Sequence, residues 1–330
     1  MNQVKFSSKT KLDVAELKEV LVGRFVAGEP VIVKVHFGEP GNPNAFTPND
    51  VKPLVEALKD LGFKTILTDT PVTYSSPRNS KAGYEQVVTE RGYREISDCF
   101  IEDDYVKQQV GDLEFEVAKN LTAAKNMLVL SHVKGHECAG FGGAIKNLGM
   151  GALSPATKAM IHDVSKPIIN PDLCIGCGTC AQLCPAKAID MVEGKAVPDH
   201  GRCFGCSICE LACPQLALQP KKKIFDEALA MGAVAAIKLM PENTFYINVI
   251  NRVSKVCDCD SDSHAPIIAA DLGIVYAETA VLADQASIDL LREKEGNHPF
   301  EKANHKDPML QIKHAAEYGD MGREYDLEQL

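Results

Sequence analysis

The sequence contains no tryptophan, and aromatic residues make up only 6% of its 330 positions. Basic residues are also scarce, because 35 Lys and Arg stand against 45 Asp and Glu, and the longest basic run is the three lysines at 221–223. Non-specific binding of nucleic acid requires many cations to neutralise phosphates. A formal net charge of −10 therefore argues against a nucleic-acid-binding protein.

Long apolar segments are absent as well. No stretch reaches the roughly 18 consecutive apolar residues that cross a bilayer, and residues 1–14 lack the apolar centre of a secretory signal peptide. We therefore expect a cytoplasmic protein that makes no use of a membrane. Hydrophobic residues nevertheless make up 45% of the chain. This content suffices for one large core, or for a core with a small satellite domain.

Strand-like and helix-like segments alternate over most of the chain. Residues 31–36 and 64–69 are typical of short buried strands. Between them, Thr47 and Pro48 predict the start of a helix, because Thr is a favoured N-cap and Pro a favoured first helical residue. Apolar residues then recur at helical spacing up to Leu61. This βαβ unit predicts an α/β fold with a mostly parallel sheet flanked by helices.

The pattern continues towards the C-terminus. We expect the charged stretch 298–330 to wrap the surface. Further helices are expected at 79–91, 222–239 and 281–292, and further strands at 126–130, 245–250 and 266–270.

Eight of the twelve cysteines form two runs with the same spacing. The first run is Cys174, Cys177, Cys180 and Cys184 before Pro185, and the second is Cys203, Cys206, Cys209 and Cys213 before Pro214. The runs are 29 residues apart, which indicates an internal duplication. Zinc ribbons need neither a third cysteine at the same interval nor a Cys-Pro. The spacing is instead typical of two four-iron, four-sulfur clusters.

The first three cysteines of each run can bind three of the four irons of one cluster. Three cysteines at this interval fold a tight loop whose backbone N–H groups point at the sulfurs and stabilise their negative charge. The fourth ligand comes from outside the loop, and the last cysteine of each run serves the other cluster. We therefore assign Cys174, Cys177, Cys180 and Cys213 to cluster 1, and Cys203, Cys206, Cys209 and Cys184 to cluster 2.

The composition changes abruptly on both sides of the cysteine runs. The strand and helix pattern stops near Lys166 and resumes near Lys221. We infer a small α+β domain with two clusters at residues 165–220. It interrupts one α/β host domain, whose two parts are residues 1–164 and 221–330.

Two family resemblances follow from these motifs. The cluster segment resembles bacterial two-cluster ferredoxins over about 55 residues. The host resembles the domain-of-unknown-function 362 family, often described as uncharacterised iron–sulfur centre proteins, and this implies a fold and an iron–sulfur label but no reaction. One departure is Thr279-Ala280, where the family usually has Asp-Pro. The resembling stretches include residues 34–42, 68–74, 78–79, 131–136, 142–151, 257–259 and 271–274, of which Lys146 to Gly151 is the most specific.

A glycine-rich segment at 140–151 surrounds Lys146. Glycines allow close approach of the backbone to a ligand, so Gly142, Gly143, Lys146 and Asn147 are candidates for binding a phosphate or carboxylate. The segment is not a Walker A loop, because Asn147 stands where Ser or Thr must bind magnesium. It also lacks a dinucleotide fingerprint, and no strong flavin motif is present. The alternative is a turn required only for packing.

Polar residues follow the expected strands and predict a shared cleft at the sheet edge, where ligands of parallel sheets bind. His132 and His136 are candidate proton donors, because an imidazole titrates near neutral pH. Hydrogen-bonded structural histidines are the alternative. Cys257 and Cys259 form a candidate additional metal or redox pair, with two reduced thiols in an acidic loop as the alternative. The other polar residues of this cleft are His36, Glu39, Asn42, Asp69, Thr73, Tyr74 and Arg78.

Together these patterns indicate a cytoplasmic iron–sulfur oxidoreductase. Its clusters would transfer electrons between a redox partner protein or low-potential carrier and a small anionic molecule bound by the host domain. Two alternatives remain: a non-enzymatic electron carrier or docking protein, and a protein in which the clusters are structural or sensory.

The cysteine motifs lead to a direct test. We expect protein purified without oxygen to contain about eight irons per chain. Elemental analysis together with colorimetric sulfide determination measures this. Zinc in place of iron, or far fewer irons, contradicts the assignment of both clusters.

Overall fold

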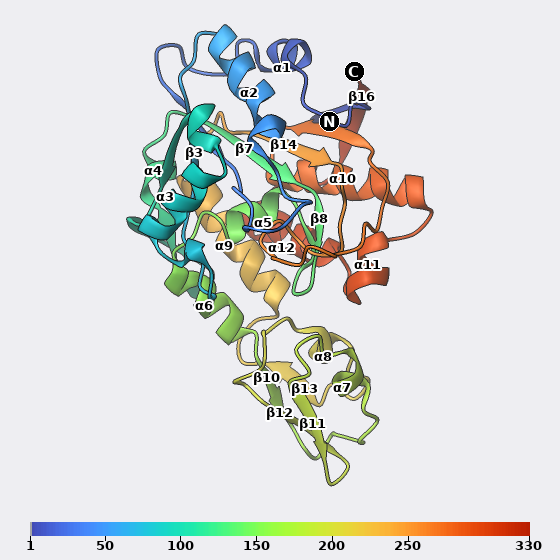
Figure 1. Cartoon of the computed structure of the whole chain (residues 1–330). Coiled ribbons are helices and arrows are strands. Elements are labelled where there is room, and N and C mark those ends of the chain that lie inside the picture. The colour runs from blue at the N-terminus through green and yellow to red at the C-terminus, as the bar shows by residue number, and fades with distance from the viewer. Residues whose placement is uncertain (1) are drawn as a thin grey trace.

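An eight-stranded sheet forms the centre of the larger part of the molecule (Figure 1). The computed structural model describes residues 2–330. Five neighbouring strand pairs are parallel, and the two pairs formed by β15 are antiparallel. The strand order is β16 (Tyr325–Gln329), β1 (Asn2–Ser7), β15 (Gly273–Ala277), β14 (Phe245–Ile250), β7 (Asn126–His132), β2 (Val31–Lys34), β3 (Thr65–Asp69) and β4 (Asp98–Ile101).

Helices cover both faces of this sheet. The two faces have separate cores, because successive side chains of a strand point to opposite sides: Met127 and Val129 belong to one core, and Leu128 and Leu130 to the other. The second core is covered by α1 (Val14–Leu21), α2 (Pro48–Asp60) and α3 (Lys81–Glu90). The first is covered by α4 (Lys119–Thr122), α5 (Ala144–Gly149), α6 (Pro155–Val164), α9 (Phe225–Leu239), α10 (Ala280–Glu295), α11 (Pro299–Asn304) and α12 (Met309–Gly319). The predicted α/β fold is therefore confirmed.

The start of α2 has the local chemistry that the sequence predicts. Thr47 and Asp50 form a capping box, in which each side chain bonds the backbone N–H of the other residue. Val51, Leu54 and Leu58 then lie on one buried face of the helix. This face packs α2 against the sheet, and α2 is the crossover connection from β2 to its parallel neighbour β3.

Short elements complete the larger part of the molecule. Its loops contain the 3₁₀ turns η1 (Pro77–Asn79) and η2 (Tyr93–Glu95). Two antiparallel hairpins add to them, β5 (Tyr105–Val110) with β6 (Leu113–Ala118), and β8 (Lys134–His136) with β9 (Gly140–Gly142). Among residues 2–330, no helix combines the length and apolar character needed to cross a bilayer.

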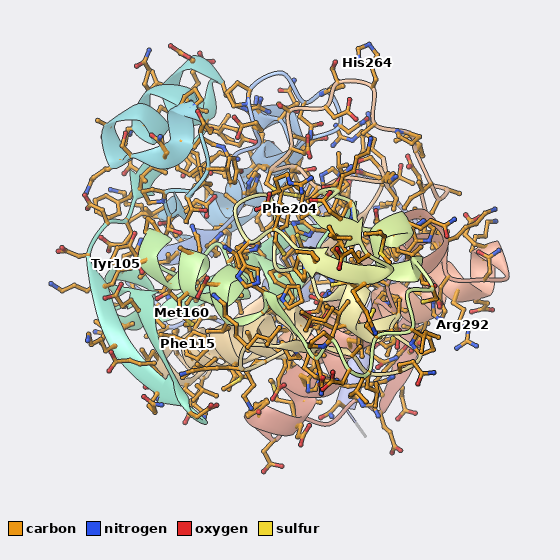
Figure 2. The ribbon with its side chains drawn as sticks, turned by 90° about the horizontal axis from the view of Figure 1, so that it is seen from below. Tyr105, Phe115, Met160, Phe204, His264 and Arg292 are labelled. Carbon is orange, nitrogen blue, oxygen red and sulfur yellow. A yellow bond between two sulfur atoms is a disulfide. The ribbon has the colours of Figure 1, made fainter. Side chains whose placement is uncertain are left out.

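Residues 167–220 form a smaller lobe below the sheet (Figure 1). It begins after α6 and ends before α9, and the antiparallel pair of β10 with β13 joins its two ends. In the view from below, the lobe lies over the middle of the molecule, with Phe204 near the centre (Figure 2). Its elements are β10 (Pro167–Ile169), α7 (Thr179–Leu183), β11 (Ile189–Val192), β12 (Lys195–Pro198), α8 (Ile208–Leu211) and β13 (Leu218–Pro220).

Two expectations about the C-terminal third are wrong. Residues 266–270 form no strand beyond one isolated bridge at Ile267, and the strand follows at β15. The stretch 298–330 does more than wrap the surface, because Phe300 and Ile312 are fully buried in the first core. Because charged residues dominate this stretch, its few core residues are not recognisable from the sequence.

Lys306 connects this C-terminal stretch to the lobe. Its buried ammonium lies 2.6 Å from the carboxylate of Asp226 at the start of α9. The same ammonium donates hydrogen bonds to the carbonyl oxygens of Cys138 in the larger part and Cys206 in the lobe. One charged group thus binds three segments that are far apart in the sequence.

We expect Lys306→Met to destabilise the protein strongly, because it leaves the carboxylate of Asp226 buried without its counter-ion. Breaking one side of a buried ion pair costs about 3–5 kcal/mol. The double variant Lys306→Met with Asp226→Leu removes both charges, so it should recover much of this loss. Urea unfolding of the anaerobic protein measures both. An equal loss in the single and double variants contradicts a charge effect.

Candidate functional site

A cavity of about 260 Å³ lies at the carboxyl ends of β2, β3 and β7. Loops that follow these strands supply its walls, as is usual for ligand sites of parallel sheets. The structure therefore brings most of the expected cleft residues together. Glu39 and Asn42 lie behind the wall, where they bind other residues. The sequence-predicted residues in the lining are His36, Asp69, Thr73, Tyr74, Arg78, His132, His136, Gly142, Gly143, Lys146, Asn147, Cys257 and Cys259.

The glycine-rich segment binds an internal anion. The backbone N–H groups of Ala144 and Ile145, at the start of α5, donate to the carboxylate of Asp284 at 2.7 and 2.9 Å. A Cβ on Gly143 would lie 2.2 Å from this carboxylate, so glycine is required there. These two amides are thus occupied, which corrects the expectation that the amides of this segment face an external anion.

Asn147 is also satisfied within the protein. Its amide nitrogen donates to the carbonyl oxygen of Leu130, and its amide oxygen accepts from Lys34 at 2.7 Å. Lys146 differs from it. Among residues 2–330, the ammonium of Lys146 has only the sulfurs of Cys257 and Cys259 as hydrogen-bond partners, at 3.7 and 3.8 Å. Burial lowers the pKa of Lys146 to about 8.

Two other buried cations near the cavity, Lys34 and Arg78, are paired with carboxylates. Lys34 lies 2.9 Å from Asp69. Burial opposes ionisation of Asp69, but Lys34 and the neighbouring cations outweigh it and lower the pKa of Asp69 to about 2. Arg78 is bound by the carboxylate of Glu39. These pairs form a rigid polar floor under the cavity.

Lys158 on α6 is a cavity residue that the sequence did not reveal. Its ammonium donates to the hydroxyl of Thr70 at 2.8 Å and to the carbonyl oxygen of Pro71. Because it is buried, its pKa falls to about 7. Lys158 belongs to no sequence motif. It reaches the cavity because α6 packs against the loop that follows β3.

The two histidines lie in buried surroundings. His132 is hydrogen-bonded to Asp258 at 2.8 Å and to Asn251, and its ring stacks on Phe46 at 4.1 Å. Burial lowers the pKa of His132, and lowers that of His136 further. Burial thus disfavours the protonated form of both imidazoles, although both ring nitrogens of His132 face oxygen acceptors. The role of the two histidines as proton donors stays a prediction.

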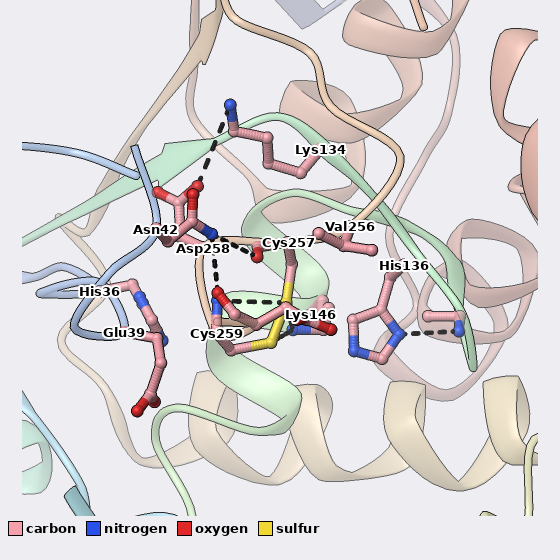
Figure 3. Close-up of a disulfide and its surroundings, with 12 residues drawn as sticks. His36, Glu39, Asn42, Lys134, His136, Lys146, Val256, Cys257, Asp258 and Cys259 are labelled. Atoms are coloured by element: carbon pink, nitrogen blue, oxygen red, sulfur yellow. Dashed lines mark hydrogen bonds and ion pairs between the residues drawn. A yellow bond between two sulfur atoms is a disulfide. The ribbon is translucent and has the colours of Figure 1, made fainter. Parts of the chain in front are cut away.

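Cys257 and Cys259 form a disulfide on the cavity wall (Figure 3). Lys146 and the ring of His136 lie beside the two sulfurs in this view. A nitrogen of His136 and both sulfurs lie within 4.8 Å of one another. The alternative of two separate reduced thiols therefore does not describe this structure.

Two small cavities in the lobe are each lined by four cysteines. The first is lined by Cys174, Cys177, Cys180 and Cys213. The second is lined by Cys184, Cys203, Cys206 and Cys209. Each set combines three cysteines of one run with the last cysteine of the other. A four-iron cluster needs four converging thiolates, so the residues present fit two such groups.

The loop around the second of these cavities touches the large cavity. His162 lines the large cavity, and its Nδ1 lies 2.7 Å from the carbonyl oxygen of Phe204. A Cβ on Gly205 would lie 2.0 Å from the carbonyl oxygen of His162. The ammonium of Lys306 donates to the carbonyl oxygen of Cys138, which also lines the large cavity, and to that of Cys206. By contrast, Cys177 of the first set is exposed to solvent.

The fold and these cysteines define an α/β protein with iron–sulfur-type motifs. The chain belongs to the family described as "Domain of unknown function (DUF362)", whose profile matches residues 31–289. This confirms the family that the sequence motifs predict.

Short segments of the chain are similar to a hydrogenase subunit and to a ferredoxin. A stretch of 33 residues, 10% of the chain, is 64% identical to the coenzyme F420 hydrogenase subunit gamma of Methanococcus voltae and covers 14% of it. A stretch of 31 residues, 9% of the chain, is 48% identical to Ferredoxin-2 of Desulfomicrobium norvegicum and covers 52% of it. The chain thus spans at most about half the length of these relatives, and the matches indicate iron–sulfur involvement.

Two solved structures are distantly similar. One is a protein from Thermotoga maritima, with 9% identity and a TM-score of 0.46 over 88% of this chain and 57% of that one. The other is the lactate racemase apoprotein from Thermoanaerobacterium thermosaccharolyticum, with 12% identity and a TM-score of 0.37 over 89% of this chain and 58% of that one.

Gly205 provides a test of the contact between the lobe and the cavity. Gly205→Ala places a methyl group against the backbone of His162, at a residue with φ of +64°. We expect the loop to shift and the second cysteine set to lose its metal, so that the iron content falls from about eight to about four per chain. Elemental analysis measures this.

Gly178→Ala is the matched control. It introduces the same side chain at φ of +76° in the first run, but its Cβ meets no atom of the described chain within 4 Å. Ser207 already adopts a positive φ at the equivalent position of the second run. If both variants lose iron equally, backbone strain rather than the contact with His162 is responsible.

Proposed function

We propose that this chain binds two four-iron, four-sulfur clusters and transfers electrons between an external donor and a small anionic molecule in the large cavity. The observation that carries the proposal is the contact between the loop of Cys206 and the wall of the cavity, together with Lys146, which has no carboxylate partner in the described part of the chain. Cys174, Cys177, Cys180 and Cys213 would hold cluster 1, and Cys184, Cys203, Cys206 and Cys209 would hold cluster 2. Bound clusters of this type supply electrons one at a time.

The positions of the two cysteine sets support an order of electron transfer. Cys177 is exposed, so the first cysteine set is accessible to a redox partner protein or low-potential carrier. The second set lies next to Cys138 and His162, both of which line the cavity. Electrons would thus enter or leave at cluster 1 and reach the cavity from cluster 2. A cytoplasmic location belongs to this proposal.

The residues of the cavity then bind and protonate the ligand. Lys146 would bind an anionic group, because its ammonium lacks a carboxylate partner within residues 2–330. Lys146 and Lys158 are also the better proton donors, since burial lowers their pKa values to about 8 and about 7. Amines with these values lose and regain a proton near neutral pH. His36 and His136 remain neutral hydrogen-bonding groups.

Binding of small anions tests this role of Lys146. We expect Lys146→Ala to weaken binding by about 10- to 100-fold, because a hydrogen bond to a charged group contributes about 1.5–3 kcal/mol. Isothermal titration with inorganic phosphate and a panel of small mono- and dicarboxylates measures the affinity. Lys52→Ala, at an exposed lysine of α2, is the matched control. Electron paramagnetic resonance of both variants checks that the clusters are intact.

The pH dependence follows from the same pKa. The pKa of Lys146 in the folded protein is lowered to about 8, so the cation predominates below this pH and the neutral amine above it. Anion affinity should therefore fall as the pH rises through about 8. Lys146→Arg should extend binding to higher pH. If no anion binds at any pH although the clusters are reduced reversibly, the protein is an electron carrier and the ligand role is refuted.

A further inference from the structure

The disulfide between Cys257 and Cys259 is poorly suited to stabilising the fold. It links residues only two positions apart in the sequence. The stabilisation from a disulfide increases with the length of the loop that it closes, because longer loops lose more freedom in the unfolded chain. A bond of this kind constrains the unfolded chain very little. Its presence at a cavity therefore calls for a chemical explanation.

The loop that carries the disulfide is held in place by other contacts. The side-chain amide of Asn42 donates to the carbonyl oxygens of Cys257 and Asp260 at 3.2 and 2.8 Å. The buried carboxylate of Asp258 accepts from the backbone N–H of Phe46 at 3.0 Å. These bonds involve no sulfur. The disulfide can open and close while the cavity wall stays in place.

The surroundings of the two sulfurs favour a thiolate. The ammonium of Lys146 lies almost equally far from both, at 3.7 and 3.8 Å. The backbone N–H of Cys259 also donates to the sulfur of Cys257 at 3.3 Å. A cation and an N–H donor stabilise a sulfur that carries negative charge. They make either sulfur a good leaving group when the bond is reduced.

We propose that Cys257 and Cys259 are a redox-active couple that accepts two electrons by way of the clusters and passes them as a pair to the molecule in the cavity. This inference rests on the proposed function. It adds the step that converts single electrons into an electron pair, and it makes the ligand a two-electron acceptor. Lys146 is the positioning residue, because its ammonium stabilises the negative charge of the thiolate.

The electrons and protons balance as follows. Opening of the disulfide consumes two electrons and one proton, so that one sulfur becomes a thiol and the other a thiolate beside Lys146. A low-potential one-electron donor supplies the two electrons one after the other, each by way of cluster 1 and then cluster 2. The couple then returns to the disulfide as the ligand takes both electrons, the thiol proton and one proton from the ammonium of Lys158, which solvent protonates again. The ligand gains two electrons and two protons in total.

Counting thiols and electrons tests the proposal on the full chain with its clusters. Under anaerobic conditions, titanium(III) citrate reduces the protein, free thiols are alkylated, and mass spectrometry identifies the labelled residues. We expect Cys257 and Cys259 to be linked before reduction and both labelled after it. In coulometric titration, Cys257→Ser should take up about two electrons fewer per chain than the wild type. Its paramagnetic cluster signals should be unchanged.

Two further variants separate this role from a structural one. Cys99→Ala removes another buried cysteine and should leave the electron count unchanged. Lys146→Gln should shift the midpoint potential of the couple to a more negative value, because the thiolate loses its cation, and Lys146→Arg should restore it. An unchanged potential in Lys146→Gln overturns the role of the lysine.

The outcomes distinguish this inference from the proposed function. If the clusters are reduced but the disulfide stays closed, the couple is refuted and the proposed function stands. If the cysteines and His136 instead retain zinc or copper in both redox states, a metal site replaces the couple. If no clusters are present, or if they cannot be reduced, the proposed function itself fails.

Discussion

The buried ammonium of Lys306 joins the three parts on which the site depends. It is fully buried with the carboxylate of Asp226, and its remaining hydrogen bonds go to backbone carbonyl oxygens on either side of the junction between lobe and sheet. Leaving a fully buried cation without partners is costly, so the contacts of Lys306 constrain all of these partners together. The lobe is therefore fixed against the wall of the large cavity at the loop of Cys206. A cluster held there would be next to the ligand, and this proximity is what makes electron transfer the most economical interpretation.

Internal ion pairing also explains which residues of the cavity are available for chemistry. Asp284 occupies the two amides at the start of α5, Asp69 neutralises Lys34, and Asp258 binds His132. These groups are bound within the protein. Among residues 2–330, Lys146 lies beside sulfur atoms and not beside a carboxylate, and the ammonium of Lys158 donates to neutral oxygens. The two lysines therefore have lowered pKa values, about 8 and about 7, which suit proton transfer near neutral pH.

Sequence reasoning succeeded where the cause is local. The start of α2 at Thr47 and Pro48 and the buried runs of β2 and β3 depend on neighbouring residues, and both were predicted closely. It was less successful at the C-terminal stretch, because Phe300 and Ile312 are isolated apolar residues among charges. It also treated the histidines as titrating near neutral pH, since the extent of burial is a property of the packed molecule. Lys158 and Lys306 carry no sequence signal, and only packing reveals them.

Periodicity and ligand spacing along the chain were enough to predict the family, the α/β class and the grouping of eight cysteines. The packing of the folded chain sets which of these residues are neighbours. Packing places Lys146 beside the sulfurs of Cys257 and Cys259. It also places the carboxylate of Asp284 at the amides of the glycine-rich segment, and the loop of Cys206 at the cavity wall. These contacts join residues 100 to 140 positions apart. Their formation depends on the packing of whole helices against the sheet, which no local pattern specifies.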